Sequence, residues 1–466
     1  MMQQRRISTS HHRNLLSIML LMALYGLILQ MTVASIAPAA LPIQDNADSN
    51  ALLMSSGSSN ITSNITSNIT SKITSDSTSK LASSISSNIS SNISSKAQVL
   101  DTENPAAVFE GGKLFRAGNL KVLVLRGSYN EMGRQYGGLM KDDLNEIYNI
   151  ISADFGKTPG SGYDDMLRTG RWMYQSYPQR YKEILKGMAE TSGLGLDKEL
   201  IVCSMEYTYM PPSMQCSGIA AWGNYTSGGP LVFGRNYDNG PKLAEFVSVV
   251  VYNPEDGSIP VASLTYTGAV YVTTGMNREG IFLELNNGQP SEAMQLSNRV
   301  LSLATLFSFL ESCGTLDQID SNFHTSLPDN AFIINAANRT GAFSYEWATF
   351  NVARRNPDKD GLLVSTNHFV DPSWGVFDRK HLPTDLWDSR QRRENLLMLG
   401  EKCKGNFSAA AMMNIMSIPF KNGGFLMPSP HDTSYQVVAV PEDLTIWVKV
   451  SGVQDWTEVD LKPLFG

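Results

Sequence analysis

The pattern of apolar and polar residues divides the chain into three parts. Residues 1–43 contain one long apolar run, residues 44–100 form a Ser/Thr/Asn-rich tract, and residues 101–466 alternate apolar and polar positions at helix and strand spacing. The tract repeats a single isoleucine among polar residues, a period that would fit a helix. However, Ser, Thr and Asn are poor helix formers, and isolated isoleucines bury too little surface to order a chain. We therefore predict a disordered, flexible stalk ahead of one globular domain.

The apolar run at residues 15–36 predicts export. Basic residues precede it and small residues stand at its end, which is the arrangement of a secretory signal. Its 22 residues exceed the roughly 7–15 of a signal core and match the roughly 20 of a membrane-spanning helix. Two alternatives stay open, a cleaved signal peptide and a retained membrane anchor. Both predict an extracellular or cell-surface protein.

The stalk is rich in Asn-X-Ser/Thr sequons, which accept glycans on an exported chain. Sequons also occur downstream at Asn224, Asn338 and Asn406. The alternative is an unmodified low-complexity linker. The clustering favours glycosylation, and the predicted sites are Asn60, Asn64, Asn68, Asn88, Asn92 and Asn224.

The globular part predicts helices and strands in separate groups. A buried strand is expected at 122–126, and helices at 127–155 and 176–192, with 200–210 a buried helix or strand. Short β-branched and aromatic runs then predict strands at 217–222, 231–235, 246–252, 261–266, 281–285, 331–335, 342–347, 361–365, 435–440 and 445–450, with helices at 297–313, 388–400 and 408–416. Such grouping favours an α+β layered fold over a doubly wound sheet.

Composition excludes several classes of function. The net charge of −7 argues against a nucleic-acid partner. The four cysteines are far apart and show neither CxxC nor Cys/His zinc spacing, which argues against a structural zinc site. They are too few for a dense disulfide framework, and the pairing of Cys203, Cys313 and Cys403 stays open. The mechanism predicted below implies no metal and no cofactor.

Cys216 opens a predicted β-hairpin. Two apolar runs flank an Asn/Ser/Gly turn near residue 227, so Cys216 should pair with about residue 238. The hairpin then gathers the Cys216 thiol, the Arg235 guanidinium and the Asp238 carboxylate. No histidine is placed nearby, and an α-amine freed by cleavage between Gln215 and Cys216 could serve as the base. The alternative is a buried, inert cysteine beside a structural Arg235–Asp238 ion pair.

The stretch from Cys216 to Asp238 resembles the start of the mature chain in N-terminal-nucleophile (Ntn) hydrolases. It is similar to the acyl-coenzyme A:6-aminopenicillanate acyltransferases (peptidase family C45) and to the related choloylglycine hydrolase/penicillin V acylase group. Further motifs follow these families in order: Gly-Ser-Tyr-Asn-Glu-Met-Gly-Arg-Gln-Tyr-Gly at 127–137, Asn-Arg-Glu-Gly at 277–280, Ser-Thr-Asn-His-Phe at 365–369 and Asp-Ser-Arg at 388–390. The resemblance covers about residues 120–455 and implies a four-layer αββα sandwich.

The resemblance also implies residue roles. Cys216 would be the nucleophile, its freed amine the base, and Asp238 the group that orients this amine. Gln215 precedes the expected cleavage site, where the acyltransferases commonly carry Gly or Asp. Residues 101–215 would stay bound to the catalytic chain 216–466. The remaining implied site residues are Arg235 beside the thiolate, Asn367 as oxyanion donor, Asn286 or Asn287 near the same oxyanion hole, and Arg390.

These observations predict an exported, self-processing enzyme that cleaves a linear amide through a thioester and passes the acyl group to water or an amine. Its partner would be a small-molecule amide, with a membrane tether only through the N-terminal segment. Two alternatives remain. One is a non-catalytic cell-surface binding or adhesion protein with the same fold, and the other is a cysteine protease that uses His368 or His324.

Overall fold

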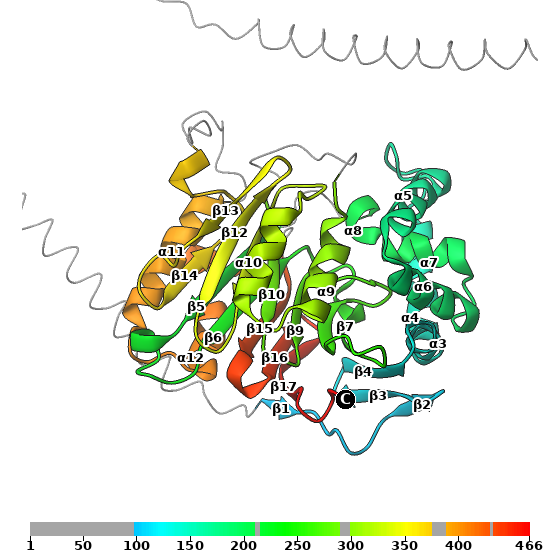
Figure 1. Cartoon of the computed structure of the whole chain (residues 1–466), viewed down its shortest axis with the longest axis horizontal. Coiled ribbons are helices and arrows are strands. Elements are labelled where there is room, and N and C mark those ends of the chain that lie inside the picture. Colours follow the sequence, from blue (N-terminus) through cyan, green and yellow to red (C-terminus); the bar gives the residue numbers. More distant parts are fainter. Residues whose placement is uncertain (1–96, 210–214, 289–298, 375–387, 429–431) are drawn as a thin grey trace, which may run out of the picture. The chain divides into compact units, whose positions relative to one another are not determined.

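The computed structural model describes residues 97–209, 215–288, 299–374, 388–428 and 432–466 (Figure 1). The predicted signal or anchor and the five stalk sequons lie outside the described residues. Within the five described ranges, no helix is both long and apolar enough to cross a membrane. The predicted segment at 15–36 is not among them, so export stays a prediction.

Two β-sheets form the centre of the fold. The seven-stranded sheet has the order β1 (Gln98–Val99), β17 (Gln454–Asp460), β16 (Thr445–Val450), β15 (Thr433–Val440), β6 (Val232–Asp238), β5 (Gln215–Ala221) and β14 (Leu362–Ser365). The ten-stranded sheet has the order β13 (Asn351–Arg355), β12 (Ala342–Ala348), β11 (Phe332–Ala337), β10 (Phe282–Asn287), β9 (Thr274–Asn277), β8 (Val261–Tyr266), β7 (Val247–Pro254), β4 (Leu120–Gly127), β3 (Gly112–Ala117) and β2 (Ala107–Phe109).

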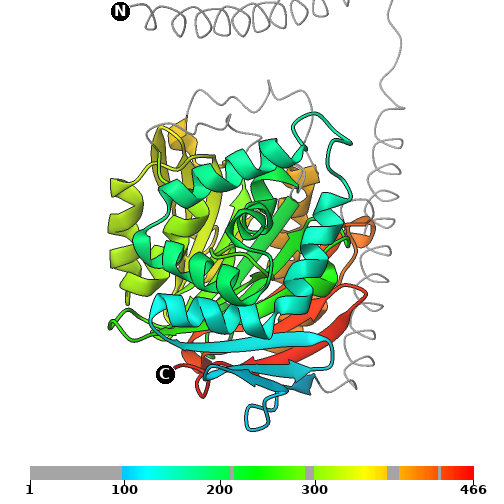
Figure 2. The same ribbon diagram turned by 90° about the vertical axis from the view of Figure 1, so that its right-hand side faces the viewer.

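Helices cover the outer face of each sheet. The seven-stranded sheet carries α11 (Ser389–Lys402) and α12 (Ala409–Met416), whose apolar side chains share a core with it. On the ten-stranded side lie α3 (Tyr129–Leu139), α4 (Lys141–Ser152), α5 (Tyr163–Ser176), α6 (Gln179–Thr191), α7 (Leu196–Cys203), α8 (Met205–Thr208), α9 (Ser302–Ser312) and α10 (Leu316–Thr325). Figure 2 shows α3 to α7 gathered in front of the sheets. The predicted four-layer αββα sandwich is confirmed.

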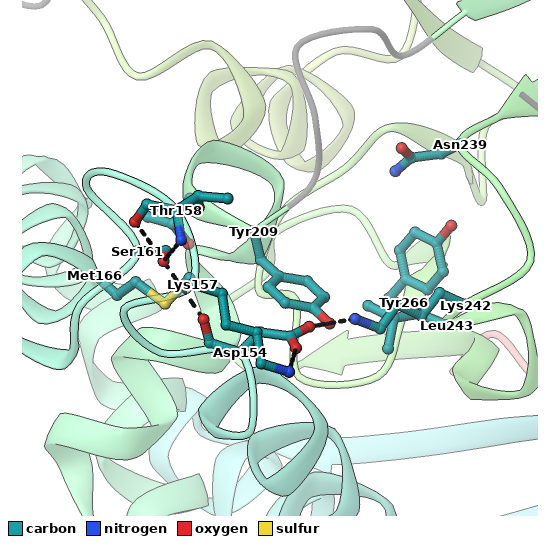
Figure 3. Close-up of a pocket in the computed structure, with 11 residues that line it drawn as sticks. Asp154, Lys157, Thr158, Ser161, Met166, Tyr209, Asn239, Lys242, Leu243 and Tyr266 are labelled. Carbon is teal, nitrogen blue, oxygen red and sulfur yellow. Dashed lines mark hydrogen bonds and ion pairs between the residues drawn. The ribbon is translucent and has the colours of Figure 1, made fainter. Parts of the chain in front are cut away.

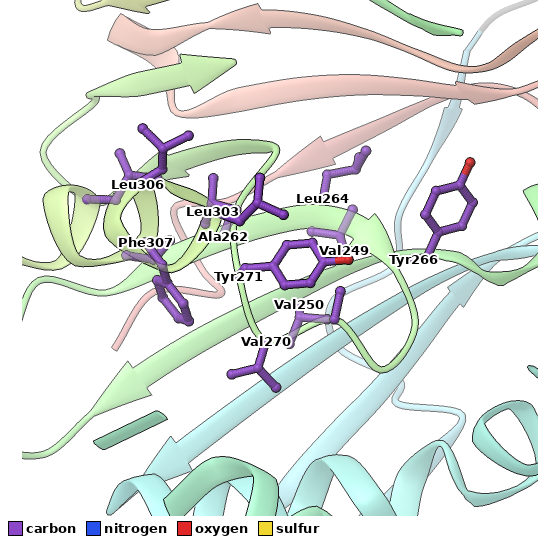
Figure 4. Close-up of a cluster of buried hydrophobic side chains, with 14 of the residues drawn as sticks. Val249, Val250, Ala262, Leu264, Tyr266, Val270, Tyr271, Leu303, Leu306 and Phe307 are labelled. Carbon is purple, nitrogen blue, oxygen red and sulfur yellow. The ribbon is translucent and has the colours of Figure 1, made fainter. Parts of the chain in front are cut away.

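The main core explains why the central strands are apolar along their whole length. Both faces of β7 are covered, so Val249, Val250 and Val251 are all buried. Val249 faces Val437 of the opposing sheet, and Val250 points to the other side (Figure 4). Alternation of apolar and polar residues therefore disappears in the strands that position the site.

The predicted strands are all present, and the differences lie in the helices and in short strands that were not predicted. The helix predicted at 127–155 is two helices, α3 and α4, because Met140 between them has non-helical dihedrals. Residues 200–210 are helical as far as Thr208. Strands β1 (Gln98–Val99), β2, β3, β9, β13 and β17 and helices α5 and α10 were not predicted. Several of these strands have only two to four residues, and α5 and α10 carry many exposed polar residues that weaken the apolar pattern.

The segment before Cys216 is woven into the sandwich. It supplies β2, β3 and β4 to the ten-stranded sheet, where β4 pairs in parallel with β7. It also supplies α3 to α8. These contacts would hold the segment in place even if the chain were cut at residue 215.

Gly218 allows β5 to lie close against β10 of the other sheet. A Cβ atom at this position would collide with the Glu284 carboxylate and would stand 2.9 Å from Asn335 Nδ2. Both side chains are buried and cannot move into open space.

We therefore predict that Gly218→Ala lowers the free energy of unfolding by about 1–3 kcal/mol, the usual cost of overpacking. Thermal denaturation would measure the change. Gly341→Ala is the matched control, because its nearest neighbour would be 4.0 Å away at Trp222. Equal stability of the two variants would contradict the tight contact between β5 and β10.

Candidate active site

Cys216 lies at the second position of β5 and is completely buried. In the β5–β6 hairpin it pairs with Tyr237, one residue from the predicted partner, and Gln215 pairs with Asp238. The hairpin therefore does bring Cys216 beside the end of β6. The peptide that would be cleaved is the first one in a regular strand.

Strand register also explains how Asn367 reaches Cys216. β14 pairs with β5 antiparallel, with Ser365 opposite Gly218. Continuing this register by two residues places Asn367 opposite Cys216. There the Asn367 side chain replaces a backbone acceptor, because the Cys216 N–H donates to Asn367 Oδ1 at 3.0 Å. The other end of the amide, Nδ2, donates to the carbonyl of Asn287 at 2.9 Å.

Arg235 crosses from β6 to the opposing sheet beneath the thiol. Its Nη2 lies 3.6 Å from Cys216 Sγ and 2.8 Å from the Leu285 carbonyl, to which it donates. Its Nη1 donates to Thr274 Oγ1 at 2.6 Å. Glu284 Oε2 lies 3.6 Å from Nε, and both side chains of this ion pair are fully buried.

The helix that follows Asn367 contributes an arginine that the sequence did not single out. Arg392 Nη1 donates to the Cys216 carbonyl at 2.8 Å, and Nη2 donates to Asn367 Oδ1 at 2.7 Å. The sequence pointed instead to Arg390, which is only half-buried. Two residues along a helix turn the side chain by about 200°, so the two arginines point to opposite sides of α11. Arg392 is therefore the arginine that holds Cys216.

Asp238 is buried at the end of β6. Its Oδ1 accepts from Thr433 Oγ1 at 2.6 Å, and its Oδ2 lies 3.9 Å from Arg392 Nη1. Burial raises the pKa of Asp238 from 3.8 to about 7, against the opposing effects of Arg392, Thr433 and Arg235. A carboxyl group with this pKa can accept or release a proton near neutral pH.

The Cys216 thiol is protonated at neutral pH while the chain is continuous. Burial raises its pKa from 9.0 to about 12, and the positive charge of Arg235 only partly offsets this. The carboxylates of Asp238 and Glu284 add to the rise. The thiol is thus a latent nucleophile that needs a nearby base.

The two asparagines at the end of β10 have different positions. Asn287 contacts the site through its carbonyl, as described above. Asn286 Nδ2 instead donates to Ser365 Oγ at 2.9 Å and to Glu284 Oε1 at 3.1 Å. Asn335 bonds the same two acceptors. Asn286 therefore belongs to a buried network that supports Glu284 and β14.

Neither histidine considered in the sequence contacts the thiol. His324 lies on the exposed face of α10, 3.8 Å from Asp320. His368 Nδ1 lies 2.7 Å from Ser389 Oγ, which accepts from the Asn367 N–H at 2.8 Å. His368 is thus next to the loop that carries Asn367 rather than beside Cys216.

The remaining candidate residues are the cysteines, a predicted glycosylation site and the potential metal ligands of the described part of the chain. Cys203, Cys216, Cys313 and Cys403 are all free thiols. Asn224 is exposed, as a glycosylation site must be. No group of three or more potential metal ligands occurs among the described residues.

A cavity of about 370 Å³ is lined by none of the residues that contact Cys216 (Figure 3). One wall belongs to the segment before Cys216 and the other to the chain after it. Asn239, directly after Asp238, lies in the second wall together with Tyr266. The ring of Tyr266 packs edge-on against Tyr237, the strand partner of Cys216, with centroids 6.0 Å apart. Asn239 and Tyr266 therefore link this cavity to the Cys216 hairpin. The residues that line it are Asp154, Lys157, Thr158, Ser161, Met166, Thr208, Tyr209, Asn239, Lys242, Leu243 and Tyr266.

Comparison with known proteins shows a family resemblance in part of the domain. Residues 225–414 match the family model "Acyl-coenzyme A:6-aminopenicillanic acid acyl-transferase". The predicted resemblance to this acyl-transferase family is confirmed. An uncharacterized protein of Archaeoglobus fulgidus is 24% identical in an alignment of 315 residues, and the match covers 56% of this chain and 52% of that protein. The chain thus spans about half the length of the curated relative it matches.

Three solved structures are similar to this chain. A variant of the conjugated bile acid hydrolase from Clostridium perfringens has a TM-score of 0.40 at 10% identity, and the match covers 54% of this chain and 94% of that chain. Penicillin V acylase from Agrobacterium tumefaciens has a TM-score of 0.40 at 10% identity, with 54% of this chain and 88% of that chain covered. The Caenorhabditis elegans ortholog of N-acylethanolamine-hydrolyzing acid amidase has a TM-score of 0.35 at 19% identity, with 48% of this chain and 93% of that chain covered. All these TM-scores lie below 0.5, so the fold is assigned from the chain's own two sheets.

The match to the acyl-transferase family begins after Cys216 and ends before Thr433. Cys216 and Thr433 are therefore assigned to the site by geometry alone. Arg392 lies inside the matched span and follows Ser389, which opens α11. Helical periodicity, counted from Ser389, places Arg390 and Arg392 on different sides of α11. It does not indicate which of the two sides faces Cys216.

We predict that Arg392→Lys slows any reaction at the Cys216 peptide by about 10- to 100-fold, because a charged donor to two buried acceptors is worth about 1.5–3 kcal/mol. The rate of chain cleavage, followed by gel electrophoresis, measures this. Arg390→Lys is the matched variant on the opposite side of α11 and should cleave at the parental rate. A larger effect at Arg390 would reverse the assignment.

Proposed function

We propose that this protein is an exported, self-processing cysteine Ntn amidohydrolase or acyltransferase. Cys216 would be the nucleophile, and a small linear amide would be the substrate. The acyl group would pass through a thioester to water or to an amine. The match to an acyl-transferase family supports the reaction class.

One observation carries this proposal. Every reactive part of Cys216 is held by a buried polar group: the N–H by Asn367, the carbonyl by Arg392, and the thiol beside Arg235. An inert core cysteine needs none of these groups, and burying two arginines around it would be costly without a function. These contacts fix the backbone and the thiol of Cys216, and the carbonyl that the thiol would attack is that of the preceding residue, Gln215.

Self-cleavage would follow from these contacts. Cys216 Sγ attacks the carbonyl carbon of Gln215 while the thiol proton passes to Asp238. The C–N bond then breaks, and the Cys216 nitrogen takes up a proton, which leaves a Gln215–Cys216 thioester and a free α-amine. Water hydrolyses the thioester, releasing the Gln215 carboxylate and restoring the thiol.

Turnover would use the new amine as the general base. It takes the proton of the thiol, and the thiolate attacks the carbonyl carbon of the substrate amide. The amine product leaves with a proton, and the acyl-thioester is then released to water or to a second amine. Asn367 and Asn287 would stabilise the oxyanion. In other enzymes, removal of one such donor raises the activation free energy by roughly 3–4 kcal/mol.

The decisive experiment is intact-mass and N-terminal analysis of the purified protein. We expect a fragment of 251 residues that begins at Cys216 and ends at Gly466, since 466 − 215 = 251. Cys216→Ala should stay a single chain. An intact Gln215–Cys216 bond in active protein would exclude the amine as base. An intact bond in protein that shows no activity on amides would favour the surface-binding alternative.

Asp238→Asn should separate stability from function. Because the pKa of Asp238 is raised from 3.8 to about 7, the folded state resists its ionisation. The contribution of Asp238 to the free energy of unfolding is therefore greatest below pH 3.8, and a few kcal/mol of it are lost as the pH rises through about 7. At pH 8 the asparagine variant should therefore melt at a higher temperature than the parent and yet fail to cleave itself.

Both readouts are needed for this variant. Thermal melts at pH 5 and pH 8 measure the first, and gel electrophoresis measures the second. The stabilisation should be smaller at pH 5, where the parental carboxyl is already protonated. Unchanged self-cleavage in Asp238→Asn would remove Asp238 from the mechanism.

A further inference from the structure

Glu346 is a buried carboxylate that the proposed mechanism does not use. It stands on β12 and is only 1% exposed. Its surroundings on this face of the sheet are apolar: Ile333 is its partner on β11, and Ala348 lies two residues along β12. A carboxylate in such surroundings is stable only when hydrogen-bond donors satisfy it. The position of those donors therefore shows what Glu346 holds in place.

Donors to Glu346 come from the loop that follows β14. The N–H of Val370 donates to Oε1 at 2.5 Å, and the N–H of Asp371 is shared between Oε1 at 3.2 Å and Oε2 at 3.1 Å. The indole N–H of Trp374 donates to Oε2 at 2.5 Å. The Trp374 ring also stacks on the buried Phe369, with centroids 5.2 Å apart. Both oxygens of one side chain therefore bind residues 370–374.

The same loop carries Asn367. Val370 is three residues after Asn367, so their Cα atoms are at most about 11 Å apart. Ser389 of α11 also holds this residue, because its Oγ accepts from the Asn367 N–H at 2.8 Å. Glu346 holds the chain that follows. The backbone behind the Asn367 side chain, which binds the Cys216 N–H, is thus supported from two directions.

Arg355 connects Glu346 to the strand that leads into the loop. Its Nε lies 3.8 Å from Glu346 Oε1, and its Nη2 donates to the carbonyl of Val364 in β14 at 2.6 Å. Arg355 belongs to β13, which pairs with β12. The β12–β13 pair therefore contacts the chain on both sides of Asn367, at Val364 and at residues 370–374. This is the placement expected of a support for Asn367.

From this geometry we infer that Glu346 is a positioning residue for the reaction at Cys216. Its carboxylate fixes residues 370–374, and these fix the backbone from which the Asn367 side chain reaches Cys216. The inference rests on the proposed function, because Asn367 has a catalytic role only if Cys216 reacts. The alternative is that Glu346 contributes to the stability of the fold and to nothing else.

The test compares two buried carboxylates. Glu346→Gln keeps the shape of the side chain but replaces one acceptor oxygen by an amino group, which cannot accept the loop N–H groups. Glu311→Gln on α9 is the matched control, because Glu311 is 3% exposed and accepts from the hydroxyls of Tyr129 and Tyr181. Both variants should lower the melting temperature by a similar few degrees.

Only Glu346→Gln should slow cleavage of the Gln215–Cys216 bond. We expect a loss of about tenfold or more, because a small misplacement of a reacting group can cost about 100-fold. The rate is followed by gel electrophoresis during cell-free synthesis of the full chain. Glu311→Gln should cleave at the parental rate.

Hydrogen exchange tests the loop contact independently of the reaction. It is measured by mass spectrometry on the full chain with Cys216→Ala. In this background Glu346→Gln should raise the exchange rate of the Val370 and Asp371 amides about tenfold or more, and Glu311→Gln should leave it unchanged. Trp374→Phe removes the indole donor and keeps a ring, so it should give smaller changes of the same sign in both measurements. This variant provides the test if Glu346→Gln does not fold.

Three results would overturn the inference: cleavage of Glu346→Gln at the parental rate, an equal slowing in Glu311→Gln, and slow cleavage with unchanged exchange at Val370 and Asp371. A parental chain that is never cut would overturn the proposed function and the positioning role together. Faster exchange in Glu346→Gln would even then show that Glu346 holds the loop. Failure of the inference and failure of the proposed function are therefore distinguishable.

Discussion

The buried guanidinium of Arg235 is the constraint on which the site depends. A charge in the core is stable only when it is paired, and Arg235 finds its partners on the opposing sheet. Its Nη2 donates to the Leu285 carbonyl, its Nη1 donates to Thr274, and Glu284 forms the ion pair with it. The same pairing that joins the two sheets fixes the guanidinium 3.6 Å from Cys216 Sγ. Sheet packing and thiol environment are therefore one structural feature.

The contacts on the other side of Cys216 come from strand register. Asn367 meets Cys216 because β14 ends two residues too early to offer a backbone partner there. Arg392 then binds both the Asn367 side chain and the Cys216 carbonyl. The end of a strand thus creates a place where side chains replace backbone hydrogen bonds, and this makes one peptide of β5 unlike its neighbours.

Local patterns predicted much of this arrangement, and long-range contacts account for what they missed. The turn composition gave the β5–β6 register to within one residue, and apolar runs gave the central strands. Arg392 was missed because its role depends on the phase of α11 against the sheet. The cavity lysines were missed because Asp154 and Lys242 are far apart in sequence and meet only in the fold. Thr433 belongs to a third distant strand.

The buried charges also suggest how so reluctant a thiol could react. With Asp238 and Glu284 ionised, two carboxylates balance Arg235 and Arg392. Moving the Cys216 proton to Asp238 replaces one carboxylate by a thiolate, so the cluster stays neutral. The transfer is uphill, because the raised pKa of the Cys216 thiol lies above the raised pKa of Asp238. Part of that difference is repulsion from the Asp238 charge, which the transfer itself removes. Self-cleavage by this route would therefore be slow, and it would need no histidine.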